Sequence, residues 1–492
     1  MLQAFAPWLS RGLSRIILVA LSLGWGGTVV GQAPPAKPAT QPPPAAAKPD
    51  DAADPDKDKD EAPKSERFID PSAKAALAIF KPLNYTSRSI TLSNTGVALV
   101  NGAGNALTRL QNMAARVENE DPALIKNYVE FFAAELSKRD NINAILAPPA
   151  NMPATAPQAR GLERAVDALT RPIVDARANN NTGFLTNYTR ILFESSLPKL
   201  LDNNYLTRLD AMIVLGMAGG TTPVALDLYA SQLKLADQCL GVKIWAARGL
   251  TNAAQSGKAN IDTLRAITAA DALVTFLNSD PKLPYFAQFR ALEALGSIRV
   301  ATVSRPDLKL DVASVVAGLL VDPSARMETR AWAAWALGML RVASQVSPYN
   351  FPLAGSEIGD LAATLGTEIV AEYDDHPETF ERDKDQATAL TALLMFQVVP
   401  SLAGEEGISD SGLLRSTHPN AAAARPFLTK LDDKIKAVSR EAYELIRAGG
   451  VAQKGKRNDL EAKVAELRSF LDQNKPKDRR LVPGGPMVAD GR

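Results

Sequence analysis

A short pattern of small and apolar residues recurs four times between residues 208 and 343 and restricts the fold more than any other feature. It consists of an alanine, a leucine four positions later and a small residue directly after the leucine. Residues four positions apart lie on the same face of an α-helix. The alanine and the glycine let two helices approach closely, while the leucine fills the groove between them. The copies are Ala211/Leu215/Gly216, Ala246/Leu250/Thr251, Ala291/Leu295/Gly296 and Ala333/Leu337/Gly338.

The copies return at a nearly regular spacing. Their last positions lie 35, 45 and 42 residues apart, and the intervals hold further apolar segments at 223–235, 261–277 and 308–321. This period, with two helices per unit, resembles the HEAT/armadillo class of α-solenoid. The resemblance implies an all-α fold, a right-handed solenoid or superhelix of antiparallel helix pairs. An irregular alanine-rich bundle is the alternative, because such a bundle can also carry the pattern.

The last copy lies in an almost entirely apolar stretch, residues 326–343, with Trp332 and Trp335 at helical spacing. A helix that is apolar nearly all round is buried among its neighbours. We therefore expect both tryptophans to lie in the core rather than to form an exposed docking surface. Trp245 occupies the comparable place in an earlier copy, and the same expectation applies to it.

Charge and residue counts exclude several classes of function. The 492 residues carry 55 basic and 54 acidic side chains, so no global field attracts nucleic acid or an anionic membrane. The single cysteine, Cys239, excludes an intramolecular disulfide and a cysteine-based metal cluster. It lies in an apolar run, so we expect a buried, inert thiol. With two histidines, no site can have three histidine ligands.

Three local motifs suggest chemistry but favour a structural interpretation. Residues 101–107 begin like a dinucleotide-binding loop, yet Leu107 replaces the third glycine and no βαβ pattern follows. His376 lies among carboxylates that could bind a divalent metal, but Pro377 breaks any helix there, so we expect a solvated loop. His418 precedes another proline and indicates a loop at the start of a helix. We predict no catalytic residue, cofactor or metal.

The N-terminal residues 1–31 have the pattern of a secretory signal peptide. Arg11 and Arg15 precede the apolar run 16–23, and small residues follow up to Gly31. Cleavage there would leave Gln32 as the new N-terminus. The alternative is an uncleaved anchor, although the apolar run 16–30 is shorter than the ~20 residues of a spanning helix. We expect export and no stable membrane span after cleavage.

Composition divides the rest of the chain. Residues 32–67 are rich first in proline and alanine and then in mixed charges, so we expect a disordered linker, either a spacer or a solubilising tail. An α-helical repeat domain should cover residues 68–448, and a C-terminal helix with a flexible tail should cover 449–492. Residues 88–100 could form a strand or a helix.

Periodicity places the other elements. Helical patterns cover 122–137, 158–178, 184–200, 206–218, 356–373, 383–400, 421–448 and 460–471. Loops are expected at 349–355, with Ser356 as the next helix N-cap, and at 402–419. The last residues, 475–492, should be frayed.

These observations favour an exported, non-enzymatic scaffold that binds another protein of the cell envelope. Repeat arrays offer extended surfaces without any catalytic residue. Four arginines on the pattern helices are candidate partner contacts, although their stems could instead cover apolar surface: Arg290, Arg299, Arg330 and Arg341. The alternatives are a cell-envelope hydrolase or sugar-active enzyme that uses paired carboxylates, and a small-ligand carrier. A cleft with two partly buried carboxylates would favour the enzyme.

Overall fold

The secondary structure is helical throughout the part of the chain that the computed structural model describes, residues 106–146, 160–256, 261–303, 311–344 and 348–488. Within these ranges the only strand-like pairings are two isolated bridges, Val300 with Arg341 and Arg480 with Met487. The expected all-α class is therefore confirmed there. The predicted signal peptide, the linker, the segment 88–100 and most of the motif 101–107 lie outside the described residues.

The first described helices surround α7, which contacts both α4 and α5. The predicted helix 122–137 is confirmed as α5. The predicted helix 184–200 is wrong at its end, because the backbone of Ser195 is extended and its hydroxyl donates to the Leu192 carbonyl. The elements are α4 (Ala106–Ala114), α5 (Pro122–Ser137), α6 (Arg139–Leu146), α7 (Gly161–Ala178), α8 (Thr182–Glu194) and the short 3-10 helix η3 (Pro198–Asp202).

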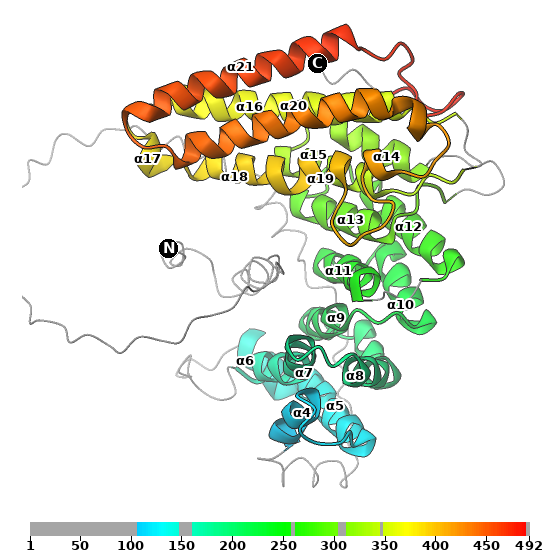
Figure 1. Ribbon diagram of the computed structural model, residues 1–492. Helices are drawn as coiled ribbons and strands as arrows, with labels where there is room; N and C mark the ends of the chain where they lie inside the picture. The colour runs from blue at the N-terminus through cyan, green and yellow to red at the C-terminus, as the bar shows by residue number, and fades with distance from the viewer. Residues whose placement is uncertain (1–105, 147–159, 257–260, 304–310, 345–347, 489–492) are drawn as a thin grey trace, which may run out of the picture. The chain divides into compact units, whose positions relative to one another are not determined.

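The four helices that carry the recurring pattern form a row, in which each contacts the next (Figure 1). They are α9 (Tyr205–Ala218), α11 (Leu240–Ser256), α13 (Tyr285–Ile298) and α15 (Met327–Met339). A second set packs beside the row and also makes successive contacts: α10 (Pro223–Lys234), α12 (Thr263–Leu277) and α14 (Asp311–Val321). The alanines and leucines of the pattern are all buried, as predicted.

The small residues of the pattern lie where neighbouring helices approach most closely. A Cβ atom at Gly216 would lie 2.6 Å from the carbonyl oxygen of Trp245 in α11. One at Gly296 would lie 2.3 Å from the ring of Trp335 in α15. One at Gly338 would lie 2.2 Å from the carbonyl oxygen of Ser401. Any larger residue would push the helices apart, so the pattern specifies this spacing.

Hydrogen bonds from arginine side chains to backbone carbonyls at helix ends also connect helices of the fold. The Nη2 of Arg177 in α7 donates to the Met217 carbonyl in the last turn of α9, at 2.8 Å. The Nε of Arg299, just after α13, donates to the Met339 carbonyl at the end of α15, at 2.9 Å. Donor and acceptor are 40 residues apart in both bonds. Both satisfy carbonyls that a helix end leaves without an intrahelical partner.

Longer helices follow the row. Helix α16 contacts both α20 and α21, and these two contact each other (Figure 1). Helix α21 therefore packs on helices that precede residue 448. The elements are α16 (Phe351–Asp375), α17 (Phe380–Asp383), α18 (Asp385–Leu393), the π-helical turn η4 (Leu394–Val398), α19 (Val399–Ala403), the 3-10 turn η5 (Leu413–Arg415), α20 (Ala421–Arg447) and α21 (Val451–Gln473).

The start of α16 corrects one prediction. The expected loop 349–355 is wrong, because the helix begins at Phe351. Asn350 caps it, with its side chain accepting a hydrogen bond from the Leu353 N–H at 3.1 Å. The proline of this segment lies in the first turn, where no N–H is needed. Ser356 is therefore not an N-cap but a buried residue inside the helix.

The C-terminal segment is not frayed over its described part. Leu481 is buried, and its carbonyl accepts a hydrogen bond from the Asn350 N–H at 2.8 Å. Arg479 forms an ion pair with the buried Glu357 of α16. The Val488 N–H donates to the Arg479 carbonyl at 2.7 Å. An apolar anchor and several backbone bonds thus hold this segment, which composition alone did not indicate.

The stretch from Asp385 to Ala403 is long and apolar enough to cross a membrane by length and composition. In the structure one face of it is buried against α15, α16 and α20. Leu390, Leu394, Val398 and Leu402 form that face. It therefore packs here as a helix of the folded unit. Its contact with Gly338 continues the row beyond α15.

Candidate functional site

Aromatic rings meet on one side of α13 and α15. The rings of Phe289 and Trp332 stack with centroids 6.0 Å apart, and Trp332 meets Trp335 edge-on at 5.3 Å. The guanidinium of Arg290 lies over the Phe289 ring, 4.8 Å from its centroid. Trp335 and Trp245 are buried as predicted, whereas Trp332 is only partly buried. Trp332 therefore offers part of its ring to solvent.

A charged group lies beside these rings. Glu293 of α13 accepts from Arg248 of α11 at 2.6 Å and from Arg290 at 2.7 Å, through its two different carboxylate oxygens. The three side chains are largely buried, with 16%, 9% and 11% exposure for Arg248, Glu293 and Arg290. Both bonds are charge-assisted, so the carboxylate holds the two guanidinium groups in place. We call the set Arg248, Phe289, Arg290, Glu293, Trp332 and Trp335 the arginine–aromatic face.

This face ends at the loop that follows α19. The indole Nε1 of Trp335 donates to the Glu405 carboxylate at 2.7 Å. The Gly412 N–H donates to the Gly338 carbonyl at 3.0 Å, which fixes the loop on the last turn of α15. Gly404 and Gly412 have positive φ angles, which glycine adopts without strain. The loop therefore adds the Glu405 carboxylate and exposed backbone groups to the edge of the arginine–aromatic face.

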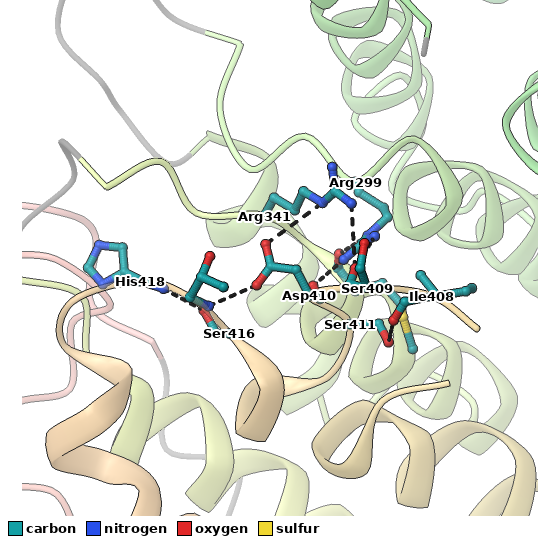
Figure 2. Close-up of polar contacts among 10 residues, drawn as sticks. Arg299, Arg341, Ile408, Ser409, Asp410, Ser411, Ser416 and His418 are labelled. Atoms are coloured by element: carbon teal, nitrogen blue, oxygen red, sulfur yellow. Dashed lines mark hydrogen bonds and ion pairs between the residues drawn. The ribbon is translucent and has the colours of Figure 1, made fainter. Parts of the chain in front are cut away.

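Arg299 and Arg341 come together under this loop, as Figure 2 shows. Arg299 donates to the carbonyls of Ser409, at 2.9 Å, and of Asp410. Burial lowers the pKa of Arg299 to about 10, and the charge of Arg341 adds to the shift, whereas Asp410 and Glu405 oppose it. The guanidinium still carries its charge at neutral pH.

Arg341 is the more exposed partner, with about half of its side chain in solvent. Its Nε lies 3.8 Å from an oxygen of Asp410, and that carboxylate also accepts from the Thr417 N–H at 2.8 Å (Figure 2). The predicted helix 326–343 ends early, at Met339, because Arg341 leaves it and its N–H donates to the Arg299 carbonyl at 3.0 Å. The two arginines thus hold the ends of α13 and α15 to the loop.

The four arginines predicted as partner contacts do not form one cluster. Arg290 belongs to the arginine–aromatic face, and Arg299 and Arg341 lie at its edge under the loop. Arg330 lies on the other side of α15, is 7% exposed, and donates through Nε to the Leu320 carbonyl at 2.9 Å. Only Arg341 of the four presents much of its side chain to solvent.

Several members of the face were not predicted from the sequence. Arg248, Glu293 and Phe289 lie on pattern helices, but their grouping depends on which helices become neighbours. One local signal was present, since Arg290 and Glu293 are three positions apart and share a helix face. Glu405 follows a glycine in a predicted loop, and nothing in its sequence context indicates the bond to Trp335.

The other candidate residues lie elsewhere. Cys239 is buried, and burial raises the pKa of its thiol. His376 ends α16 in the turn before α17, as the loop prediction expected. His418 lies in the loop before α20, also as predicted, and its Nδ1 accepts from the Asn420 N–H at 3.2 Å. Within the described ranges, no group of three acidic, histidine or cysteine side chains has the arrangement of a metal site.

Comparison of the chain with models of known families, with curated proteins and with solved structures gives no match. The role of the arginine–aromatic face is therefore inferred from its own residues. Tryptophan and arginine are enriched at the residues that dominate binding energy in protein–protein interfaces. A partly exposed tryptophan beside pre-organised arginines suits the recognition of another protein surface.

Proposed function

We propose that this chain is an exported, non-enzymatic α-helical repeat protein that serves as a scaffold for another protein of the cell envelope. The supporting observation is the row, in which each pattern helix packs on the next and glycines of α9, α13 and α15 lie at close contacts with neighbouring helices. We also propose that the helix pairs form a right-handed α-solenoid of the HEAT/armadillo-like kind. Two arginine bonds to helix ends, each of which spans 40 residues of the chain, support a common unit.

The proposed binding surface is the arginine–aromatic face with Arg341 at its edge. Its buried ion pairs fix the rings and the guanidinium groups before a partner arrives, which reduces the entropy cost of binding. Trp332 supplies apolar contact area, and Arg341 supplies a charged group at the rim. A partner with an apolar anchor and nearby carboxylates would complement this combination.

Substitution of Trp332 by alanine tests the surface. The change removes the partly exposed ring but none of the hydrogen bonds of the row. We expect capture of envelope proteins by the purified mature chain to fall strongly, and Arg341→Glu to weaken it further. Leu264→Ala, at a 70% exposed residue of α12, is the matched control and should leave capture unchanged. Arg299 is unsuitable for such a test, because it bonds three carbonyls within the chain.

Equal capture by the Trp332 variant and the control, with intact circular dichroism, would exclude this face as the binding surface. A measured turnover by the purified protein would overturn the non-enzymatic proposal. Export has its own test, which is the N-terminus of the native protein. We expect mass spectrometry to place it near Gln32, in the periplasm, the envelope or the medium, and an intact Met1 in the cytoplasm would contradict export.

A further inference from the structure

A cleft of about 320 Å³ lies where α14, α15, α16 and α21 meet, away from the arginine–aromatic face. Small-molecule sites generally have volumes of ~300–1,000 Å³, so this cleft suits a small metabolite. Charged side chains line it from three of the four helices. The lining residues are Leu320, Val321, Arg330, Glu357, Asp360, Ala363, Thr364, Arg468 and Asp472.

Arg330 is the cation on the inner wall of the cleft. It is 7% exposed, and its Nε donates to the Leu320 carbonyl at 2.9 Å. Its Nη1 lies 3.9 Å from the Met327 sulfur, a weak acceptor, and no hydrogen bond of its Nη2 is found within the described ranges. A guanidinium has five N–H donors in a fixed planar arrangement, and the bonds named here use only part of them. This edge of Arg330 therefore suits a planar anion such as a carboxylate.

Helices α16 and α21 line the cleft with both acidic and basic side chains. Asp360 comes from α16, while Arg468 and Asp472 lie four positions apart on α21. Arg468 also donates to the Thr367 hydroxyl at 3.1 Å. Glu357 is already paired with Arg479 from the C-terminal segment. A simple anion would be repelled by the carboxylates, and a simple cation by the guanidinium groups, so neither alone suits the lining.

Two further properties of the lining restrict the class of ligand that would fit the cleft. No aromatic side chain lies among the lining residues, so a nucleobase would find no ring on which to stack. Glu357 is already engaged in an ion pair with Arg479, which does not suit one of the two carboxylates of a glycosidase. These properties favour binding of a small, doubly charged molecule over the paired-carboxylate chemistry of a glycosidase.

We propose that this cleft binds a small zwitterion, an amino acid or a short peptide with free termini. Its carboxylate would lie on Arg330 and Arg468, and its ammonium group near Asp360 and Asp472. Each charge of the ligand would thus meet side chains of opposite sign. This site is independent of the proposed scaffold function, because it lies on the other side of α15 from the face that we assign to the partner.

Titration calorimetry on the mature chain tests the ligand class. The probes are L-alanine, L-alanyl-L-alanine, its N-acetyl form, its C-terminal amide, and glucose as a neutral molecule of similar size. We expect one or both zwitterions to bind, and blocking either terminus to weaken binding by about tenfold or more, since charge-assisted bonds are lost. Comparison of the affinities for L-alanine and for L-alanyl-L-alanine then shows whether the cleft prefers a free amino acid or a short peptide.

Absence of binding by both zwitterions at millimolar concentration would overturn the proposal, as would equal binding of the blocked forms or preferential binding of glucose. Arg468→Gln and Asp472→Asn change exposed residues of α21, so the fold should survive. Each should weaken zwitterion binding about tenfold. Arg440→Gln, at an exposed arginine of α20, is the control and should bind like the wild type. Wild-type affinity in both cleft variants would also contradict the site.

Discussion

The row and the long C-terminal helices are both all-α, but different sequence signals produce them. The row helices have 13–17 residues and are covered on most sides, with glycine at the closest contacts. Helices α16, α20 and α21 have 23–27 residues, and α20 buries a clear apolar stripe under a charged outer surface. Close approach depends on small residues in the row, whereas ordinary amphipathic periodicity is sufficient in α20.

The two regions also differ in how deeply their ion pairs are buried. In the row, Glu293 is largely buried between two arginines and connects α11 to α13. On α20 and α21, pairs such as Lys463 with Glu466 lie near the surface, whereas α16 has one buried pair, Glu357 with Arg479. Surface pairs contribute ~0–1 kcal/mol, whereas removal of one partner from a buried pair is strongly destabilising. The row should therefore be the region less tolerant of substitution.

The largest expected effect comes from Leu295 of the row. This leucine is fully buried, and replacing it with alanine should lower the free energy of unfolding by roughly 2–5 kcal/mol, because a cavity remains. Leu264→Ala, at an exposed leucine of α12, should change it by less than about 0.5 kcal/mol. Urea unfolding measures both variants. Equal effects would contradict the close packing of the row.

Glycine substitutions test the helix spacing in the row directly. Leucine at Gly338 should destabilise by roughly 1–3 kcal/mol or more, because its Cβ would meet the Ser401 backbone. Alanine at Gly318 of α14 meets nothing within 4 Å, so it should stabilise the helix by roughly 0.5–1 kcal/mol. Thermal unfolding of the two variants compares them. A stable Gly338→Leu protein would show that α15 and α19 do not approach as described.

The long helices depend on the Asn350 connection. Asn350→Ala removes the cap of α16 and the side-chain bonds to the carbonyls of Asp478 and Arg480. We expect a loss of about 1 kcal/mol from the cap and faster tryptic cleavage between residues 475 and 480. Asn179→Ala, which removes an exposed local bond, is the control. Unchanged cleavage would mean that this connection does not hold the C-terminal segment.

The smallest effect should come from Asp432 on α20. Burial raises the pKa of this carboxyl, although Lys436 opposes the shift. The folded protein then binds a proton more tightly than the unfolded chain, so this stabilisation is present at low pH and is lost as pH rises through the folded-state pKa. Relative to Asp432→Asn, the wild type should be less stable at neutral pH than at acidic pH. Urea melts at both pH values measure the difference, and an opposite slope would contradict the burial of this group.

Most helices were predictable because local periodicity survives in the fold. The pattern residues of α13 and α15 were correctly placed in the core, since no tertiary information was needed. The start of α16 was missed because Pro352 and Gly355 normally interrupt helices. Here the proline lies in the first turn, and the glycine accommodates a side chain of α20. The C-terminal segment was missed because its anchors lie more than a hundred residues away.

The candidate site was less predictable than the fold. Arginine recurrence on the pattern helices drew attention to Arg290 and Arg299, but it could not show which groups they contact. Arg299 bonds a loop that lies over a hundred residues later in the chain. The partner of Trp335 is likewise set by packing, because Glu405 lies 70 residues later in the chain. A single sequence carries no local signal for such contacts.

Hydrogen exchange of the purified chain tests most directly whether α9, α11, α13 and α15 form one continuous row. Backbone amides in well-covered helices exchange only through rare, large openings. We predict that these four helices exchange slowest and with similar protection, and that α10 and α12, which have exposed faces, exchange faster. Fast exchange in any one row helix, or protection in α15 no greater than in α12, would contradict the row.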